Sequence, residues 1–369
     1  MKIAYDAKRF FNNTSGLGNY SRDLVRMLSE FFPENKYVLL AKRENERGKA
    51  ILENPSVSFS PISKGNMARQ FKMGKDAQNL GVDIFHGLSG ELPLKWNKKP
   101  IQKIVTIHDL IFVHYPKFYS FFDRKIHFWK FKKAAHSADK IIAISEQTKK
   151  DVIEMLKVPA EKVVVVYQGC HAAFKTEKSQ EELNTVKSKY NLPERFVLNV
   201  GTIEERKNLF TVIKALQHTD IPLVVVGRKT KYADQILNFI KKENMEAQVQ
   251  FLEGVSMEEL ACIYQLADIF VYPSLFEGFG IPIIEAHFSK TAVITSNLSC
   301  LPEAGGKDAV YVNPLNVKDI KAKINFLWDN ESERQRRAEK SYEFALANFS
   351  DKKITGDVMK VYQEVLLSK

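Results

Sequence analysis

The sequence predicts an α/β fold built from two doubly wound parallel sheets. Apolar, strand-like runs alternate with helical patterns along most of the 369 residues, and this alternation is typical of parallel sheets with helices on both faces. The alternation stops once, in the polar stretch 176–189, and restarts at Phe196. The length allows two domains. We therefore expect Rossmann-like domains at 1–175 and 190–350 that face a central cleft, and a C-terminal helix at 353–369 that returns to the first domain.

The composition is that of a soluble globular protein. Hydrophobic residues make up 44% and charged residues 27% of the chain, and no apolar run approaches the roughly 18 residues that a membrane span needs. The first residues read as a strand with an acid in it, which does not fit a signal peptide. Cys170, Cys262 and Cys300 fit no metal or disulfide spacing, so we expect a reducing, cytoplasmic environment.

The positive charge is concentrated in the first half of the chain. Residues 1–170 hold 29 Lys/Arg and 17 Asp/Glu, a balance of +12, whereas residues 171–369 hold 26 and 27, a balance of −1. A basic half indicates an anionic partner: a membrane surface, a phosphorylated substrate or nucleic acid. No zinc-finger spacing or RNA-binding strand motif accompanies the charge, so we expect no nucleic-acid partner.

Seven strands are predicted in the first half, at 2–7, 37–41, 57–62, 83–87, 104–109, 140–145 and 163–169. The first is followed by a polar loop at 10–19 that contains Gly16 and Gly18, and then by a helix with Leu24 and Leu28 on one face. Glycines allow a phosphate to approach the backbone closely, although a plain flexible loop explains them as well. The third glycine of a dinucleotide fingerprint is missing.

Polar residues follow several of these strands. His108 and Asp109 come after 104–107, and Ser145 after 141–144. Ligands of doubly wound sheets sit at the carboxyl ends of strands, so these are candidate binding residues. The alternatives are that the histidine is a hydrogen-bonded structural residue and that Ser145 caps the helix 146–156.

The predicted helix 121–133 interleaves aromatic side chains with five Lys/Arg. One interpretation is a contact with a membrane surface or a lipid-linked acceptor. The other is an ordinary helix that buries Phe128, Trp129 and Phe131 and turns a basic face to solvent.

A second sheet is predicted from strands at 196–201, 223–227, 249–254, 269–273 and 292–296. Arg206 and Lys207 follow the first of these, just before a helix, and adjacent cations there suit a diphosphate. A solvated charged turn is the alternative.

The stretch 272–287 reads as the end of a buried strand, a tight Gly-rich loop, and a helix that begins near Pro282. Glu277 lies in the loop and Glu285 about one turn into the helix. Both carboxylates could accept hydrogen bonds from the hydroxyls of a sugar or ribose, while a surface loop with two solvated acids explains the same spacing.

Five motifs in order carry a family resemblance. They are Ser15-Gly16-Leu17-Gly18, Ile107-His108-Asp109, Gly201-Thr202-x-x-x-Arg206-Lys207-Asn208-Leu209, Pro273-Ser274-x-x-Glu277-Gly278-Phe279-Gly280-x-Pro282-x-x-Glu285-Ala286 and Ser296-Asn297-x-Ser299-x-Leu301-Pro302-Glu303. Together they resemble family 4 of the retaining glycosyltransferases, whose fold is GT-B. The resemblance spans nearly the whole chain.

The resemblance implies a nucleotide-sugar donor held mainly by the second domain and an acceptor held mainly by the first. Glu285 would bind the donor ribose, and Arg206 and Lys207 would clamp the diphosphate and stabilise the leaving group. Glu277 would contact the sugar and His108 would lie over it. The remaining implied donor contacts are Gly16, Gly18, Val255, Gly278, Phe279, Gly280 and Ile281, and the implied acceptor contacts are Asp109 and Ser145. No cofactor or metal is expected, because the two cations replace the metal.

The third motif resembles mannosyltransferases of surface-polysaccharide pathways, which favours GDP-mannose over a UDP-sugar as donor. The basic first half fits an undecaprenyl-diphosphate-linked glycan acceptor, and thus a cytoplasmic enzyme that contacts the inner membrane peripherally. Two rival functions remain at this point. One is a sugar-nucleotide epimerase or phosphorylase of the same shape, and the other is a non-catalytic glycan-binding protein.

Overall fold

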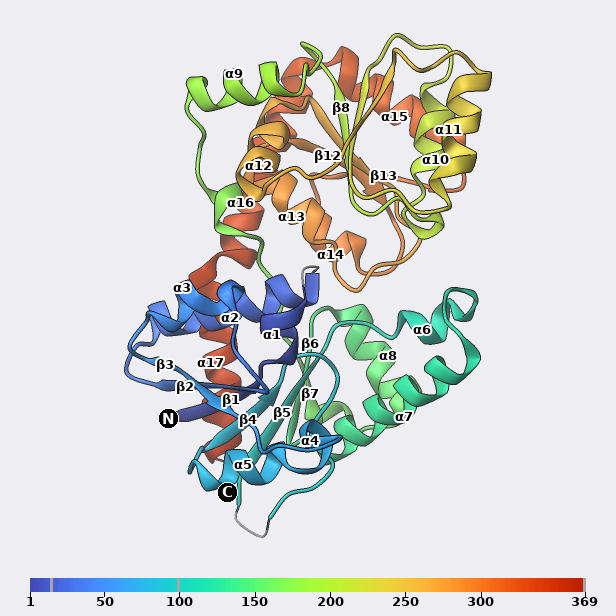
Figure 1. Ribbon diagram of the computed structural model, residues 1–369. Helices are drawn as coiled ribbons and strands as arrows, with labels where there is room; N and C mark the ends of the chain where they lie inside the picture. The colour runs from blue at the N-terminus through green and yellow to red at the C-terminus, as the bar shows by residue number, and fades with distance from the viewer. Residues whose placement is uncertain (14–15, 98–99, 368–369) are drawn as a thin grey trace. The chain divides into compact units, whose positions relative to one another are not determined.

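The computed structural model describes residues 1–13, 16–97 and 100–367. The chain forms two compact units, the first from Met1–Gln168 and Asp351–Lys369 and the second from Gly169–Ser350. In each unit a parallel sheet is covered by helices (Figure 1). In the described part of the chain, no helix is both long enough and apolar enough to cross a membrane.

The first unit is built on a seven-stranded sheet in the order β3-β2-β1-β4-β5-β6-β7, with every neighbouring pair parallel. Alternate residues of β1 point to opposite faces, so that Ile3 and Tyr5 join one core cluster and Ala4 joins the other. The strands are β1 (Lys2–Asp6), β2 (Lys36–Ala41), β3 (Val57–Pro61), β4 (Ile84–Gly87), β5 (Gln102–Ile107), β6 (Lys140–Ala143) and β7 (Val163–Val165).

Helices cover both faces of this sheet. They are α1 (Lys8–Asn12), α2 (Gly16–Phe31), α3 (Lys49–Leu52), α4 (Ala68–Phe71), α5 (Met73–Asn79), α6 (Ile111–His114), α7 (Phe121–Ser137), α8 (Glu146–Leu156) and α17 (Asp351–Leu367), with 3-10 turns η1 (Glu46–Gly48), η2 (Pro116–Phe118) and η3 (Ala160–Lys162). The predicted return of the chain's final helix is confirmed within this unit. In α17, Tyr362 is fully buried, and its hydroxyl bonds to Nδ1 of His86 at 2.7 Å and lies 3.2 Å from the Tyr5 hydroxyl.

The predicted polar loop at 10–19 is largely helical. Residues 8–12 form α1, and α2 begins at Gly16, so Gly16 and Gly18 lie in its first turn. A Cβ on Gly18 would come within 2.0 Å of the Asn13 carbonyl oxygen, so close backbone packing requires a glycine there. Ser15, which belongs to the first motif, lies outside the described residues.

The second unit is built on a six-stranded parallel sheet in the order β10-β9-β8-β11-β12-β13. The strands are β8 (Val197–Val200), β9 (Leu223–Val226), β10 (Val249–Leu252), β11 (Ile269–Tyr272), β12 (Ala292–Ser296) and β13 (Val310–Val312). The helices are α9 (Gln180–Lys189), α10 (Leu209–Leu216), α11 (Ala233–Lys242), α12 (Met257–Leu266), α13 (Ile281–Phe288), α14 (Leu301–Gly305), α15 (Val317–Asp329) and α16 (Glu331–Phe349), with 3-10 turns η4 (Ala172–Lys175) and η5 (Glu205–Lys207).

Two features of the second unit differ from the prediction. The short edge strand β13 was not expected. The polar stretch 176–189, where the alternation of strands and helices stops in the sequence, contains the helix α9. Ser179 and Glu182 form a capping box at its start, Val186 is buried, and the helix packs against α12. The capping pair satisfies backbone N–H groups at the helix start, so a polar composition is compatible with a helix.

Candidate active site

The loop between β11 and α13 positions the central acid of the second unit. β11 is buried at every residue, and the chain then turns at Gly280, whose φ of 116° is in the region that favours glycine. Pro282 stands in the first turn of α13, where a missing N–H has no cost. Glu277 is therefore held at the carboxyl end of a central strand.

The last residue of β12 and residues that follow it hold this loop by hydrogen bonds to its carbonyl groups. Ser296 Oγ donates to the Ser274 carbonyl at 2.6 Å, and Ser299 Oγ donates to the Glu277 carbonyl at 3.0 Å. Cys300 Sγ lies 3.0 Å from the Phe279 carbonyl oxygen. The Ser296-to-Glu303 motif thus has a structural task, which is to fix the backbone on which Glu277 stands.

Glu277 lies at the centre of a buried ionic cluster. Its Oε2 is 2.7 Å from Arg206 Nη1, and its Oε1 is 3.4 Å from Lys207 Nζ. Oε1 also accepts hydrogen bonds from the Tyr272 hydroxyl at 2.6 Å and from Ser274 Oγ at 2.8 Å. The structure therefore brings three predicted catalytic residues together in one contact network.

The acidic and basic side chains of this cluster are ionised. Burial alone would raise the pKa of Glu277, but Lys207 and Arg206, helped by the Tyr272 hydroxyl, lower it to about 2. Burial would likewise lower the pKa of Arg206, yet the neighbouring Glu277 raises it above its ordinary value. Burial and the Glu277 charge raise the pKa of Tyr272 well above 10. Tyr272 therefore stays protonated, and its hydroxyl donates the hydrogen bond to Glu277.

Arg206 has two further partners, Glu204 Oε1 and the Phe276 carbonyl oxygen, each at 2.5 Å. Two cations thus face two carboxylates, and the cluster is close to neutral. An anion that reached Arg206 and Lys207 would compete with Glu277 for them. Such an exchange adds no desolvation cost for the cations, because both are already charged and partly buried before the anion binds.

Glu285 lies on α13 and is only 9% exposed. Its Oε2 accepts a hydrogen bond from the Tyr264 hydroxyl of α12 at 3.1 Å. Burial, followed by the Glu285 charge, raises the pKa of Tyr264 well above 10, so this hydroxyl acts as a donor. The arrangement orients a carboxylate at the start of a helix, which suits recognition of a diol.

The other predicted donor contacts lie around this loop. Gly278 is half-buried within it, and the Phe279 ring is buried against Phe349 with ring centroids 5.5 Å apart. Phe279 can therefore offer only its backbone to a ligand. Ile281 begins α13, and half-buried Val255 precedes Ser256, the residue that caps α12.

In the first unit, His108 directly follows β5, and both of its ring nitrogens are hydrogen-bonded. Nε2 is 2.9 Å from the Leu88 carbonyl and Nδ1 is 2.8 Å from the Gln168 amide nitrogen. Since a carbonyl only accepts, Nε2 carries the proton and Nδ1 accepts. Burial lowers the pKa of His108 to about 4, so the ring is neutral at pH 7. Contact of this ring with a sugar stays a prediction. A hydrogen bond between the His108 ring and a sugar would have to replace its bond to Leu88 or its bond to Gln168.

A cavity of about 180 Å³ lies beside this histidine, and its lining includes Asp109, Arg9 and Glu91. Asp109 Oδ1 also accepts a bond from the Ile111 N–H at 3.0 Å. Ser145 is fully buried and caps α8 by accepting from the Thr148 N–H at 3.0 Å. The capping alternative is thus confirmed for Ser145, and its contact with an acceptor stays a prediction.

Comparison with known proteins identifies the family. A model of the Glycosyltransferase Family 4 matches residues 14–174, and a model of the Glycosyl transferases group 1 matches residues 180–344. An uncharacterized glycosyltransferase of Methanocaldococcus jannaschii is 30% identical over 337 residues, which is 87% of each chain. The chain belongs to glycosyltransferase family 4.

Two further likenesses characterise this glycosyltransferase. The O-antigen chain mannosyltransferase B of Escherichia coli is 26% identical over 354 residues, which cover 88% of this chain and 90% of the relative. The crystal structure of Anabaena HepE in complex with UDP and glucose superposes with a TM-score of 0.76 at 16% identity, covering 99% of this chain and all of that one. The fold is GT-B, as predicted.

Several residues of the glycosyltransferase's site were not assigned roles from the sequence. Tyr272 and Ser274 bond Glu277, Tyr264 bonds Glu285, and Gln168 bonds His108. Tyr272 and Ser274 carried a signal, since both are polar residues at the carboxyl end of a buried strand. Tyr264 and Gln168 come from distant segments and carried none. Among the described residues, no group of three or more His, Cys, Asp or Glu is placed to hold a metal ion.

Proposed function

We propose that this glycosyltransferase moves a mannosyl residue from GDP-mannose, with retention, onto a glycan or an undecaprenyl-diphosphate-linked glycan in bacterial O-antigen or capsule synthesis. The observation that carries the proposal is the buried cluster of Arg206, Lys207 and Glu277. Two fixed cations at the end of a central strand suit a departing nucleoside diphosphate, since they stabilise charge that grows as the bond breaks. No metal and no cofactor are part of the proposal.

The choice of donor rests on relatives. The Escherichia coli relative is named a mannosyltransferase of the O-antigen chain, and a second relative, the O-antigen chain mannosyltransferase RfbU of Salmonella typhimurium, carries the same kind of name. The Anabaena structure holds UDP and glucose, so a UDP-sugar is the second candidate donor. Glu285 is the proposed ribose ligand with either nucleotide, because ribose hydroxyls are common to both.

We favour a front-face displacement in which the leaving diphosphate takes the acceptor's proton. A double displacement would need a carboxylate as nucleophile on the opposite face of the sugar. Glu277 is held by two cations and two hydroxyls, and a carboxylate with a pKa near 2 is a weak nucleophile. Glu277→Gln should therefore lower activity without trapping an intermediate. A glycosyl adduct on Glu277 in intact-protein mass spectrometry would overturn this mechanism, and an inverted product in proton NMR would overturn retention.

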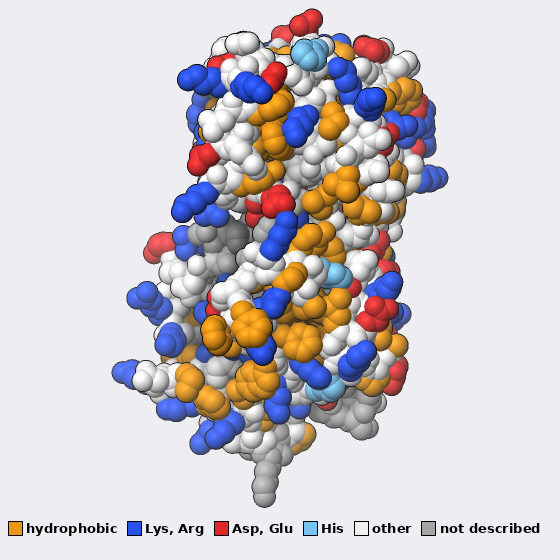
Figure 2. All heavy atoms as spheres, turned by 90° about the vertical axis from the view of Figure 1, so that its right-hand side faces the viewer, with side chains coloured by type: hydrophobic (Ala, Val, Ile, Leu, Met, Phe, Trp, Pro, Cys, Tyr) orange, Lys and Arg blue, Asp and Glu red, His pale blue; other side chains and the backbone are white. Residues whose placement is uncertain are grey.

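We further propose peripheral contact with an anionic membrane through α7. The exposed side chains of this helix include Phe121, Phe122, Ile126 and Trp129, at 54%, 76%, 52% and 53%. They lie on the same helix as the exposed Lys125, Lys132 and Lys133, and Figure 2 shows hydrophobic side chains gathered among basic ones on this side of the first unit. Apolar rings beside cations suit contact with anionic lipid, and on this proposal the enzyme works at the cytoplasmic face of the inner membrane.

The donor experiment is a thermal-shift and saturation-transfer screen of GDP- and UDP-sugars, followed by product analysis with a glycan acceptor. We expect GDP-mannose to give the largest shift and a mannosylated product. The variant Arg206→Ala/Lys207→Ala should lose both the thermal shift and the mannosylated product. The control Lys229→Ala/Lys231→Ala, in a loop of the same unit, should keep the shift and the product. An epimerised nucleotide sugar would establish the epimerase alternative. Glycan binding with no donor binding would establish the non-catalytic alternative.

A further inference from the structure

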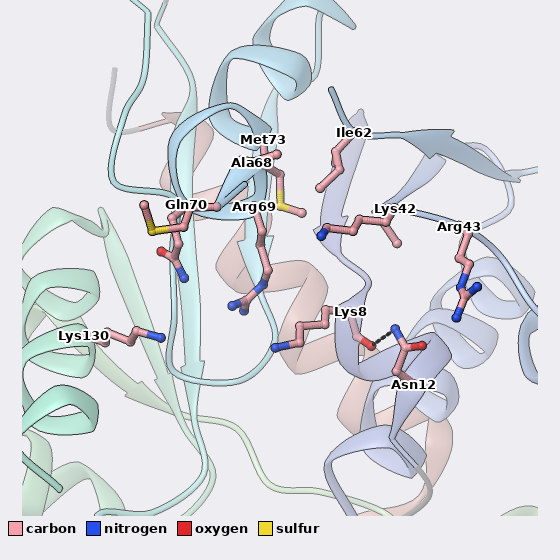
Figure 3. A pocket seen from close by; sticks show the side chains of 12 residues that line it. Lys8, Asn12, Lys42, Arg43, Ile62, Ala68, Arg69, Gln70, Met73 and Lys130 are labelled. Carbon is pink, nitrogen blue, oxygen red and sulfur yellow. Dashed lines mark hydrogen bonds between the residues drawn. The ribbon is translucent and has the colours of Figure 1, made fainter. Parts of the chain in front are cut away.

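A second cavity in the first unit lies at the carboxyl ends of β1, β2 and β3. Its volume is about 610 Å³, within the range of roughly 300–1,000 Å³ that small-molecule sites occupy. Five of its twelve lining residues are cations, supplied by four separate segments: Lys8, Lys42, Arg43, Arg69 and Lys130. In Figure 3 the nitrogen ends of Lys8, Arg69 and Lys130 converge from three of these segments. No carboxylate is among the lining residues.

Two of the five cations are balanced by acids behind the wall. Arg69 lies 2.7 Å from Asp6 and 2.6 Å from Glu91, and Lys130 lies 3.7 Å from Glu91. These contacts fix the guanidinium, which is 16% exposed. Arg69 is thus held in a fixed position in the cavity wall by its ion pairs with Asp6 and Glu91.

The other three cations are not balanced. Within the described ranges, Lys8, Lys42 and Arg43 have no carboxylate at salt-bridge distance, and all three side chains are exposed. Five cations less two acids leave an excess of three positive charges on one cavity. Burial, followed by repulsion from Arg69 and Arg9, lowers the pKa of Lys8. Cations gathered without partners repel one another, and an arrangement of this kind favours a bound anion.

The rest of the wall is mostly apolar, with two amide side chains, Asn12 and Gln70. Ala41, Ile62, Met67, Ala68 and Met73 line it. Met67 is 66% exposed and has a φ of 55°, an uncommon conformation for a non-glycine residue. Methionine side chains adapt to irregular ligands. A ligand that suits both the cationic and the apolar part of the wall carries an anionic group with a less polar group close to it.

We propose that this cavity binds the phosphate- or diphosphate-bearing end of the acceptor. This inference rests on the proposed function, because it names the chemical class of that reaction's second substrate. The cations of this cavity belong to the first unit, whereas those of the predicted donor clamp belong to the second unit and are paired with Glu277. The same chemistry is found in a lipid-linked diphosphate and in a free phosphorylated sugar.

The test is calorimetric titration of the full-length chain with farnesyl diphosphate and with inorganic diphosphate. Each titration is run in an Arg206→Ala/Lys207→Ala background, so that the donor clamp does not contribute. We expect saturable binding there, and a loss of at least tenfold in affinity when Lys8→Ala/Lys42→Ala/Arg43→Ala is added. The matched control Lys36→Ala/Lys49→Ala/Lys150→Ala removes the same charge from the same unit outside the cavity and should stay within twofold.

Two results would overturn the proposal: no saturable binding in the background variant, or equal affinities for the cavity variant and its control. Tighter binding of farnesyl diphosphate than of inorganic diphosphate would identify a lipid carrier, and equal binding would identify a phosphate group alone. If the triple variant unfolds, Lys42→Ala/Arg43→Ala replaces it. Failure of every nucleotide sugar to bind the unmodified chain would instead remove the proposed function, and the diphosphate titrations would still report on the cavity.

Discussion

In the second unit, Arg206 and Lys207 lie against Glu277 in a nearly neutral, buried cluster, whereas in the first unit Lys8, Lys42 and Arg43 face a cavity without acidic partners. Both arrangements can receive an anion, but they differ in how they do so. The paired cations give up one carboxylate as they accept another anion, so their geometry decides what binds. The unpaired cations act over a Debye length and attract many anions. The comparison indicates that geometry governs binding at the paired cations of the second unit, and that charge governs it at the cavity of the first.

The largest expected effect tests the paired cations. Lys207→Ala should leave the fold intact and lower turnover about 100- to 1,000-fold, or roughly 2.7–4 kcal/mol of barrier, by analogy with the removal of one oxyanion donor. Lys231→Ala, an exposed lysine of the same unit, is the matched control and should keep full turnover. Steady-state kinetics with a saturating donor give the answer. Turnover within twofold of the unmodified enzyme would remove Lys207 from the clamp.

The second prediction concerns the pH dependence of stability. The pKa of Glu277 falls from 4.5 to about 2 on folding, so its stabilisation is present above about pH 4.5 and is lost as the pH falls towards 2. At pH 7 this amounts to about 3 kcal/mol of unfolding free energy. Urea unfolding should show Glu277→Gln less stable than the unmodified chain at pH 7, with the gap closing below pH 4. Exposed Glu246→Gln should show no gap, and a gap that is constant with pH would contradict the ionic cluster.

The structure also shows what could be predicted from the sequence. Buried parallel strands are continuous apolar runs, and for this reason twelve of the thirteen strands in the described part of the chain were located. The three-residue edge strand β13 was too short to stand out. The nearness of Arg206 to Glu277 was predicted only through the family motifs. Tyr272 stood out as a polar residue at the end of a strand, but its role as the shared partner of Glu277 and Lys207 could not be predicted, because it meets Lys207 across 65 residues of chain.

The helix α7 shows a different limit. Its aromatic side chains lie on two faces: the interpretation as an ordinary helix is confirmed in part, and contact with a membrane stays a prediction. Phe128 and Phe131 pack against the core, as the ordinary-helix alternative has it, whereas Trp129 is 53% exposed, which that alternative does not fit. The basic cavity was not predicted at all. Its lining comes from segments between residues 8 and 130, and only the folded chain brings them together.

The third prediction tests the unpaired charge of the first unit. Lys132→Ala/Lys133→Ala removes two exposed lysines of α7 and should weaken binding to vesicles of anionic lipid about 30-fold, since each basic residue contributes about 1 kcal/mol near such a surface. Co-sedimentation at rising salt should show binding fall as screening increases. Lys149→Ala/Lys150→Ala on α8 is the charge-matched control. Vesicle binding that does not change with salt concentration, or no binding, would show that α7 is an ordinary surface helix without a membrane contact.

The smallest effect is expected from chelation. If Arg206 and Lys207 supply the positive charge that the leaving diphosphate needs, then EDTA should leave turnover unchanged and added Mg²⁺ or Mn²⁺ should not raise it. Initial rates before and after chelation, with metal re-addition, decide the matter. Loss of activity with EDTA and recovery with Mg²⁺ would show that the paired cations are insufficient by themselves.

The position of α17 has a consequence for how the chain is made. Tyr362 is buried in the core of the first unit with Tyr5 and His86, yet the ribosome adds it after all residues of the second unit. The second unit can therefore complete its fold during synthesis while the first waits with an apolar face uncovered. A nascent chain that stalls before residue 351 would present that face to chaperones or to other chains, so biogenesis of this enzyme runs against the order of its sequence.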